Sequence, residues 1–232
     1  MALKNPRYAL STLYGELTFS DERFLARMCG VSPRAIPGFL DEPSNTPEFA
    51  AHIANVAEEF RALSSVSADL YAKKVLNQYA AIRARKPSCV VETGMANGVS
   101  SSYFLLALRK NGKGKLQSID LADSTVLPKD EGPGWLVPEW LRSPWTIYLE
   151  DSRELLPKVL AQVGQLPIFI HDSLHTYEHM IWEYREAYPY LRPGGPLFSD
   201  DALWNNAFAD FSREIHASQS CILHGVGFLR KD

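Results

Sequence analysis

Five short apolar runs, separated by segments long enough for a helix, follow Pro87 and constrain the fold more than any other feature. The runs are CVVETG, LQSIDL, WTIYLED, PIFIHD and GPLFSDD, and each has an acidic residue at or near its end. The segments between them include residues 100–110, 153–163, 177–191 and 206–217. Strands that alternate with helices form βαβ units, in which helices cover both faces of a parallel sheet. We therefore expect an α/β, Rossmann-like doubly wound fold.

The C-terminal segment SCILHGVGFLRKD reads as two further short strands around Gly225 and Gly227, which form an antiparallel pair. Together with the five runs, this pair predicts a mostly parallel seven-stranded sheet. Ligands of such sheets bind at the carboxyl ends of the strands. The acidic residues at the ends of the five runs therefore predict a site at this edge.

The first part of the chain is read as a helical extension, residues 1–85, before a catalytic domain of residues 86–232. Prolines at 33, 37, 43 and 47 break this extension, and Ser32-Pro33 and Thr46-Pro47 resemble helix starts. Apolar residues in 48–85 recur mostly every three or four positions, as in helices with one buried face. We expect the extension to supply part of an acceptor pocket or a dimer surface.

The composition excludes several classes of protein. The 24 Lys and Arg against 27 Asp and Glu give a net charge of −3, without a basic run that would bind nucleic acid or an anionic membrane. The three cysteines show no metal or disulfide spacing. No apolar run approaches the length of a membrane span and no export signal is evident. We expect a cytoplasmic protein.

A glycine-containing loop follows the first run, in the sequence VVETGMANGVSSSYFLLAL of residues 90–108. Gly94 permits a tight turn, Gly98 permits a ligand to approach the backbone, and the following helix start offers free amide donors. The spacing E-x-G-x-x-x-G departs from the dinucleotide fingerprint G-x-G-x-x-G. An NAD-dependent oxidoreductase is therefore kept only as an alternative.

Two further strand ends fit the same ligand. Asp120 ends the second run, 22 residues after Gly98, where its carboxylate can accept both hydroxyls of a ribose. Glu150, Asp151 and Ser152 follow the third run, although Asp151 considered alone is read as a helix N-cap. The three strand ends together fit an adenosine lying across them.

These motifs resemble class I S-adenosylmethionine-dependent methyltransferases from about residue 89 to 201. The segments IHDSLHTYEH and LRPGGPLFSDD narrow the resemblance to small-molecule O-methyltransferases related to macrocin-type sugar methyltransferases and cephalosporin-hydroxylase-like proteins. The resemblance implies S-adenosylmethionine as cofactor. It assigns to the cofactor Glu92, Gly94, Ala96, Asn97, Gly98, Ser100, Ser101, Asp120, Leu121, Asp151, Ser152 and Asp172.

The resemblance also implies a divalent metal, with magnesium held by Asp172, Asp200 and Asp201. Hard cations prefer oxygen ligands, and the positions left open can orient a substrate hydroxyl and lower its pKa. Some relatives carry Asn where this chain has Asp201. His175, three residues after Asp172, stands where related enzymes place a general base, and imidazole can accept a proton at neutral pH. The catalytic residues implied are His175 and Asp172.

Other interpretations stay open at this point. Asp172 and Asp201 could each cap a helix, and His171, His175 and His179 at four-residue spacing could bind zinc. The long loop of residues 121–144 could cover the site, with Trp135 either shielding it or packing. We expect a small hydroxylated acceptor, no nucleic acid or membrane partner, and leave open a homo-oligomer and a non-catalytic, cofactor-binding protein.

Overall fold

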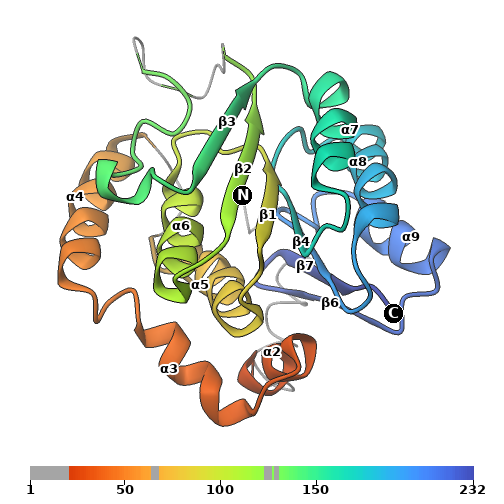
Figure 1. Ribbon diagram of the computed structural model, residues 1–232, viewed down its shortest axis with the longest axis horizontal. Coiled ribbons are helices and arrows are strands. Elements are labelled where there is room, and N and C mark those ends of the chain that lie inside the picture. Colours follow the sequence, from red (N-terminus) through yellow and green to blue (C-terminus); the bar gives the residue numbers. More distant parts are fainter. Residues whose placement is uncertain (1–20, 64–67, 123–126, 128–130) are drawn as a thin grey trace.

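A computed structural model describes residues 21–63, 68–122, 127 and 131–232 of the chain; the part of the predicted helical extension before residue 21 lies outside these residues. Seven strands form one sheet, which helices cover on both faces (Figure 1). The strands are β1 (Cys89–Thr93), β2 (Lys115–Asp120), β3 (Trp145–Leu149), β4 (Ile168–His171), β5 (Pro196–Ser199), β6 (Gln219–Leu223) and β7 (Val226–Arg230). The α-helices are α2 (Asp21–Cys29), α3 (Ile36–Asp41), α4 (Pro47–Leu63), α5 (Ala68–Arg85), α6 (Val99–Asn111), α7 (Ser152–Val163), α8 (Tyr177–Tyr190) and α9 (Ala207–Glu214).

The sheet order is β3-β2-β1-β4-β5-β7-β6. Strands β1 to β5 pair in parallel, whereas β7 is antiparallel to both β5 and β6. Strands β2 and β3 are added on one side of β1, and β4 and β5 on the other side. This order is that of a doubly wound fold with a topological switch point beside β1. The predicted mostly parallel seven-stranded sheet and its C-terminal antiparallel pair are confirmed.

Alternate residues of the central strands face two separate apolar layers. Val90, Ile170 and Phe198 belong to the layer beneath α5 and α6, while Phe169 and Leu197 belong to the layer beneath α7, α8 and α9. In Figure 1 these two groups of helices lie on opposite sides of the sheet. Both faces of the strands are therefore buried, which explains why they read as continuous apolar runs rather than as alternating patterns.

Helix α5 is built into the first of these layers. Val75, Tyr79 and Ile82 are buried in it together with residues of β1 and α6. Glu42, just after α3, accepts hydrogen bonds from the Tyr79 hydroxyl at 2.7 Å and from Arg83 Nη2 at 2.8 Å. This polar contact fixes α5 against the preceding helices. The division into residues 1–85 and 86–232 stays a prediction.

Local signals account for the helix ends that border the sheet edge. Gly98 and Gly112 flank α6 in the left-handed conformation. Asp151 caps α7 by accepting the Arg153 amide at 2.8 Å, and Thr176 caps α8 through the His179 amide. These caps satisfy amide groups that a helix start leaves unpaired. No helix among the described residues has the length and apolar character needed to cross a lipid bilayer.

Candidate active site

The loop after β1 is tied to the end of β2 by one carboxylate. Asp120 Oδ2 accepts the backbone amides of Met95 at 2.8 Å and Ala96 at 2.7 Å, and its Oδ1 accepts the Leu121 amide at 2.7 Å. Ala96 has φ = +43°, a conformation in which non-glycine residues are uncommon. Asp120 thus holds a strained turn, and it lies at the strand end where the sequence places the ribose.

Gly94 and Gly98 are required by contacts within the protein. A Cβ on Gly94 would lie 2.1 Å from the Asp172 carbonyl oxygen, and one on Gly98 would lie 2.6 Å from Val137 Cγ2 and 2.8 Å from Gly134 Cα. Both glycines also have positive φ. The space beside Gly98, which the sequence assigned to an approaching ligand, is filled by the loop after β2. Gly98 therefore positions that loop.

Glu92 does not lie at the open edge with the other acidic strand ends, as the sequence pattern had suggested. Its side chain is 1% exposed and accepts hydrogen bonds from Ser101 Oγ at 2.6 Å and from Ser118 Oγ. Trp145 Nε1 in turn donates to Ser118 Oγ at 2.6 Å. Burial raises the pKa of Glu92 to about 7 against the effect of these hydrogen bonds. Glu92 on β1 thus connects this strand to α6 through Ser101 and to β2 through Ser118, and Ser118 extends the network to β3 through Trp145.

The loop after β2 docks on the glycine-containing loop. Gly134 N donates to the Ala96 carbonyl at 2.7 Å, Leu136 N to the Asn97 carbonyl at 3.0 Å, and Trp135 Nε1 to Asn97 Oδ1 at 2.7 Å. Leu136 and Val137 are buried. Of the two interpretations of Trp135, packing within the protein is the one that this geometry supports. Residues 123–126 and 128–130 of the predicted covering loop lie outside the described residues.

The remaining residues assigned to the cofactor lie along the same edge. Asp151 is exposed and caps α7, while Ser152 is buried with its Oγ 3.2 Å from His179 Nε2. Ser100 is buried in the first turn of α6, and the Leu121 side chain is 52% exposed. The structure therefore brings the three predicted strand ends to one edge and gives Asp151 the capping role that it has in isolation.

Three carboxylates gather at the ends of β4 and β5. Asp172 follows β4 and donates its backbone amide to the Thr93 carbonyl at 2.8 Å, and Asp200 does the same to the His171 carbonyl at 2.8 Å. Candidate ligand atoms of Asp172, His175 and Asp200 all lie within 4.8 Å of one another. Burial and the neighbouring Asp200 raise the pKa of Asp172 well above its usual range. This arrangement offers oxygen ligands to a cation.

The sequence analysis missed a lysine among these carboxylates. Lys74 of α5 places its Nζ 3.1 Å from Asp200 Oδ1 and 3.0 Å from Asp201 Oδ1, and its side chain is 14% exposed. Burial opposes the charge, but Asp200 and Asp201 outweigh it and raise the pKa of Lys74. No spacing rule pairs a helical lysine with residues 126 and 127 positions later, so only the folded chain shows this contact.

His175 lies between Asp172 and an exposed tryptophan. Its Nε2 is 3.7 Å from Asp172 Oδ1, is shielded from solvent and has no hydrogen-bond partner within the protein. The Trp204 indole stacks on the imidazole at a ring-centroid distance of 5.6 Å and an angle of 2°. Burial and the neighbouring His171 lower the pKa of His175. A neutral imidazole nitrogen is therefore available at this point of the site.

Glu183, also missed by the sequence analysis, is a buried acceptor beneath the same loop. Its side chain is 0% exposed and accepts hydrogen bonds from His171 Nδ1 at 2.7 Å, His179 Nε2 at 2.9 Å, Ser173 Oγ at 2.8 Å and Thr93 Oγ1. Burial raises its pKa, but these partners outweigh burial and lower the pKa of Glu183. Its position on the buried stripe of α8 was the available signal, because a glutamate there needs partners.

The zinc interpretation of the three histidines does not match this arrangement. His171 and His179 are both engaged by Glu183, whereas His175 faces Asp172. Within the described residues, the one group with converging metal-ligand atoms consists of Asp172, His175 and Asp200. Asp172 and Asp201 are likewise not helix caps, because Thr176 caps α8 and Asn206 precedes α9.

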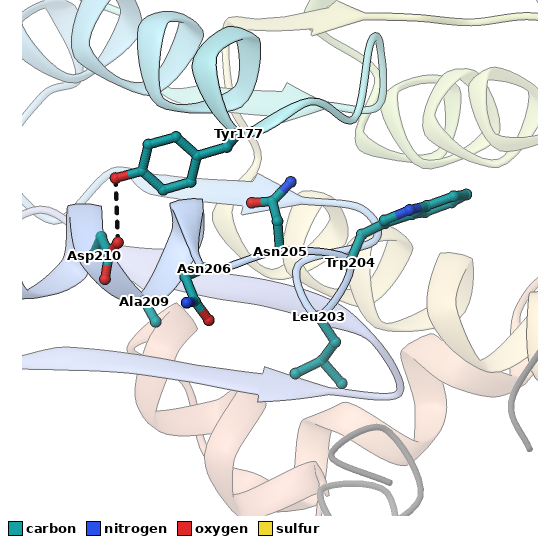
Figure 2. A pocket seen from close by; sticks show the side chains of 7 residues that line it. All are labelled: Tyr177, Leu203, Trp204, Asn205, Asn206, Ala209 and Asp210. Atoms are coloured by element: carbon teal, nitrogen blue, oxygen red, sulfur yellow. Dashed lines mark hydrogen bonds between the residues drawn. The ribbon is translucent and has the colours of Figure 1, made fainter. Parts of the chain in front are cut away.

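A groove lies beside α9 and the loop that precedes it. Its volume is about 610 Å³. Figure 2 shows Tyr177 above it, the Tyr177 hydroxyl bonded to Asp210, and the Trp204 indole pointing away at the far end. Asn205 Nδ2 donates to the His175 carbonyl at 3.2 Å, which links the groove to the loop that carries His175. The lining residues are Tyr177, Leu203, Trp204, Asn205, Asn206, Ala209 and Asp210.

The sheet order, the glycine-containing loop before α6 and the acidic ends of β2, β4 and β5 together match the Rossmann-like architecture expected of class I S-adenosylmethionine-dependent methyltransferases. Residues 91–202 match the family model described as "Methyltransferase domain". The class predicted from the sequence motifs is confirmed.

Solved structures share this fold at low sequence identity. CalS11, described as a TDP-rhamnose 3'-O-methyltransferase of calicheamicin biosynthesis, is 19% identical with a TM-score of 0.53, over 85% of this chain and 93% of that chain. MycE, a methyltransferase of the mycinamycin pathway solved with Mg, S-adenosylhomocysteine and mycinamycin VI, is 17% identical with a TM-score of 0.48, over 70% of this chain. This chain spans 47% of the length of MycE. The search of curated proteins gave no match.

Proposed function

We propose that the protein transfers the methyl group of S-adenosylmethionine to a hydroxyl of a small molecule, assisted by magnesium. The observation that carries this proposal is the free Nε2 of His175, 3.7 Å from Asp172 Oδ1 and grouped with Asp200. A proton acceptor beside hard oxygen ligands suits the activation of a hydroxyl. We extend the proposal to the macrocin-type group of O-methyltransferases, which the sequence motifs resemble.

The edge formed by β1, β2 and β3 would hold the cofactor. The positive-φ turn at Gly94, Ala96 and Gly98 leads directly into α6, whose first amide groups have no partner within the helix and can bind an anionic part of the cofactor. Asp120 holds this turn in shape through two amides and faces the ribose position, and Asp151 lies on the adenine side. When bound, S-adenosylmethionine supplies a methyl group already activated on a sulfonium.

The edge formed by β4 and β5 would hold the metal. Asp172 and Asp200 contribute oxygen ligands, and burial together with the negative charge of Asp200 raises the pKa of Asp172. Asp201 is the third proposed ligand, at the place where some relatives carry Asn. When bound, magnesium supplies a Lewis acid that orients a hydroxyl and lowers its pKa.

His175 would remove the acceptor proton. Methyl transfer to a hydroxyl oxygen releases one proton, and the unpartnered Nε2 can take it because the lowered pKa keeps the imidazole neutral. Trp204 and Asp172 hold the ring from two sides. Alignment of these groups supplies much of the rate enhancement, since the cofactor is already reactive.

The groove beside α9 would hold the acceptor. Its lining combines exposed aromatic rings with two asparagines and one aspartate, and contains no lysine or arginine. Such a surface favours an uncharged, ring-containing acceptor over one that presents a phosphate there. The description of CalS11 as a TDP-rhamnose 3'-O-methyltransferase supports a small-molecule acceptor.

The first test is calorimetric titration with S-adenosylhomocysteine, with and without magnesium, on the wild type and Asp120→Ala. We expect the wild type to bind and Asp120→Ala to bind at least about tenfold more weakly, because two amides of the turn lose their acceptor. Lys158→Met on the exposed side of α7 is the control. Absence of binding to the wild type would refute the cofactor assignment.

A screen of hydroxylated acceptors, read by mass spectrometry, follows. We expect His175→Ala to lower the methyl-transfer rate about 10²–10⁴-fold without changing S-adenosylhomocysteine affinity. Treatment with EDTA should abolish transfer and added magnesium should restore it. Transfer that is insensitive to EDTA would remove the metal from the proposal, and transfer that survives in His175→Ala would remove the base.

A further inference from the structure

Lys74 joins the candidate metal centre from outside the matched methyltransferase domain. It lies on α5, whereas the family match begins at residue 91. Its neighbours Val75, Asn77 and Gln78 are buried, so the helix that carries it is held in the core. Lys74 Nζ reaches two carboxylates at 3.0 and 3.1 Å while remaining 14% exposed. The contact is therefore a shielded ion pair rather than a loose surface pair.

The charges in this cluster balance in a specific way. By formal charge, Asp172, Asp200 and Asp201 contribute −3 and Lys74 contributes +1, which leaves −2. A divalent cation neutralises that charge. Without Lys74 the cluster would have a formal charge of −3, and without the charge of Asp201 it would have a formal charge of −1. Lys74 and Asp201 are thus opposite and equal contributions to the same site.

The geometry separates Asp201 from the other ligands. The atoms that converge within 4.8 Å belong to Asp172, His175 and Asp200, and Asp201 is not among them. Asp201 Oδ1 lies instead 3.0 Å from Lys74 Nζ, at a residue whose φ of +45° turns the backbone directly after Asp200. Lys74 Nζ contacts Asp200 Oδ1 as well, at 3.1 Å, yet of the two aspartates only Asp200 places an oxygen in the group formed with Asp172 and His175.

We propose that Lys74 is a positioning residue that pairs with Asp201, takes it out of the metal's ligand set and sets the charge of the site at −2. Asp172 and Asp200 are then the carboxylate ligands. This inference rests on the metal of the proposed function and revises its third ligand. It also gives the N-terminal helices a defined part in the site, because α5 supplies the charge that compensates Asp201.

The test is calorimetric titration of the full chain with Mn²⁺, in the presence of S-adenosylhomocysteine. Asp201→Asn should bind Mn²⁺ about tenfold more weakly, because Lys74 then competes for Asp200 alone, and Lys74→Met should bind about tenfold more tightly. The double variant should return to within about threefold of the wild type. Asp200→Asn should lose binding. Recovery in the double variant is the outcome that a ligand role for Asp201 does not produce.

Two controls keep the outcomes distinct. Lys158→Met removes the same charge from an exposed position and should leave Mn²⁺ affinity unchanged. S-adenosylhomocysteine affinity and the midpoint of thermal unfolding report whether each variant folds. Loss of Mn²⁺ binding in Asp201→Asn that persists in the double variant would make Asp201 a ligand and overturn the inference, as would an unchanged affinity in Lys74→Met.

The failure of the metal itself would look different. A wild type that binds S-adenosylhomocysteine but no Mn²⁺ would overturn both this inference and the metal of the proposed function, and would leave the cofactor assignment intact. A wild type that binds neither would contradict the proposed function as a whole.

Discussion

The two halves of the sheet edge satisfy their polar groups in opposite ways. On the cofactor side, defined as the ends of β1, β2 and β3, Asp120 accepts three amides, Glu92 accepts two hydroxyls and Asp151 caps a helix. On the acceptor side, defined as the ends of β4 and β5, two of the three carboxylates share Lys74, and His175 Nε2 has no partner within the protein. The protein itself therefore satisfies the polar groups of the cofactor side, whereas the acceptor side keeps groups that can bind a ligand.

This difference indicates that the cofactor side is preorganised. Hydrogen bonds that close on the protein's own backbone fix the cofactor side before any ligand arrives, which lowers the ordering cost of binding. The acceptor side keeps negative charge and a free nitrogen over the buried network of Glu183. Unmatched charge of this kind is retained where a cation or a reacting group will meet it.

The largest expected effect tests whether the acceptor side rests on its buried network. Glu183→Ala should lower the free energy of unfolding by about 3–5 kcal/mol, because four donors lose their shared acceptor in the interior. Urea unfolding measures this change, with Glu178→Ala at an exposed position of α8 as control. A loss below about 1 kcal/mol would show that the stability of the fold does not depend on the Glu183 network. The contrast drawn between the cofactor side and the acceptor side would then fail.

The next effect concerns the buried carboxyl of the cofactor side. The pKa of Glu92 rises to about 7 in the folded protein, so the unfolded chain gives up this proton at lower pH than the folded chain does. The free energy of unfolding should therefore fall by roughly 3 kcal/mol as pH rises from about 4.5 to above 7. Glu92→Gln keeps an acceptor oxygen and should remove this fall.

Urea unfolding at pH 5 and pH 8 measures the effect, as the difference between the wild type and Glu92→Gln at each pH. Glu154→Gln on the exposed surface of α7 serves as control. The same pH dependence in the wild type and Glu92→Gln would mean that Glu92 keeps an ordinary pKa. The cofactor side would then contain a buried charge of its own.

A smaller effect distinguishes a glycine required by packing from one required by conformation alone. Gly112→Ala should cost about 1–2 kcal/mol for its positive φ, since nothing lies within 4 Å of its added Cβ. Gly98→Ala should cost roughly 1–3 kcal/mol more, because its Cβ would overlap Val137 and Gly134. Equal losses in urea unfolding would mean that the loop after β2 is not docked here.

The smallest effect lies on the acceptor side. Trp204 is 58% exposed, so Trp204→Ala should change the free energy of unfolding by less than about 0.5 kcal/mol. Methyl transfer should nevertheless slow, because the His175 ring loses the indole that stacks on it, while S-adenosylhomocysteine affinity stays constant. A large loss of stability would place Trp204 in the core and remove this contrast between fold and site.

Most of the architecture could be predicted, because it follows from local pattern. The continuous apolar runs after Pro87 indicated buried parallel strands, and their acidic ends indicated the functional edge. Asp120, Asp172 and Asp200 were predicted in this way, whereas His175 came from the resemblance to known methyltransferases. The structure brings Asp172, His175 and Asp200 together. Glu92 was misplaced because strand position alone does not show whether a side chain turns inward.

The sequence by itself determined the sheet, its class and the residue types at each strand end, since these depend on spacing along one chain. Tertiary structure alone decided that Lys74 meets Asp201, that Glu183 gathers two histidines and that Gly98 faces Gly134. These contacts join separate elements, and Lys74 and Glu183 are charged groups that become costly or favourable only where the fold excludes water. The spacing of residues along the sequence does not show which charged groups from separate elements will be buried together.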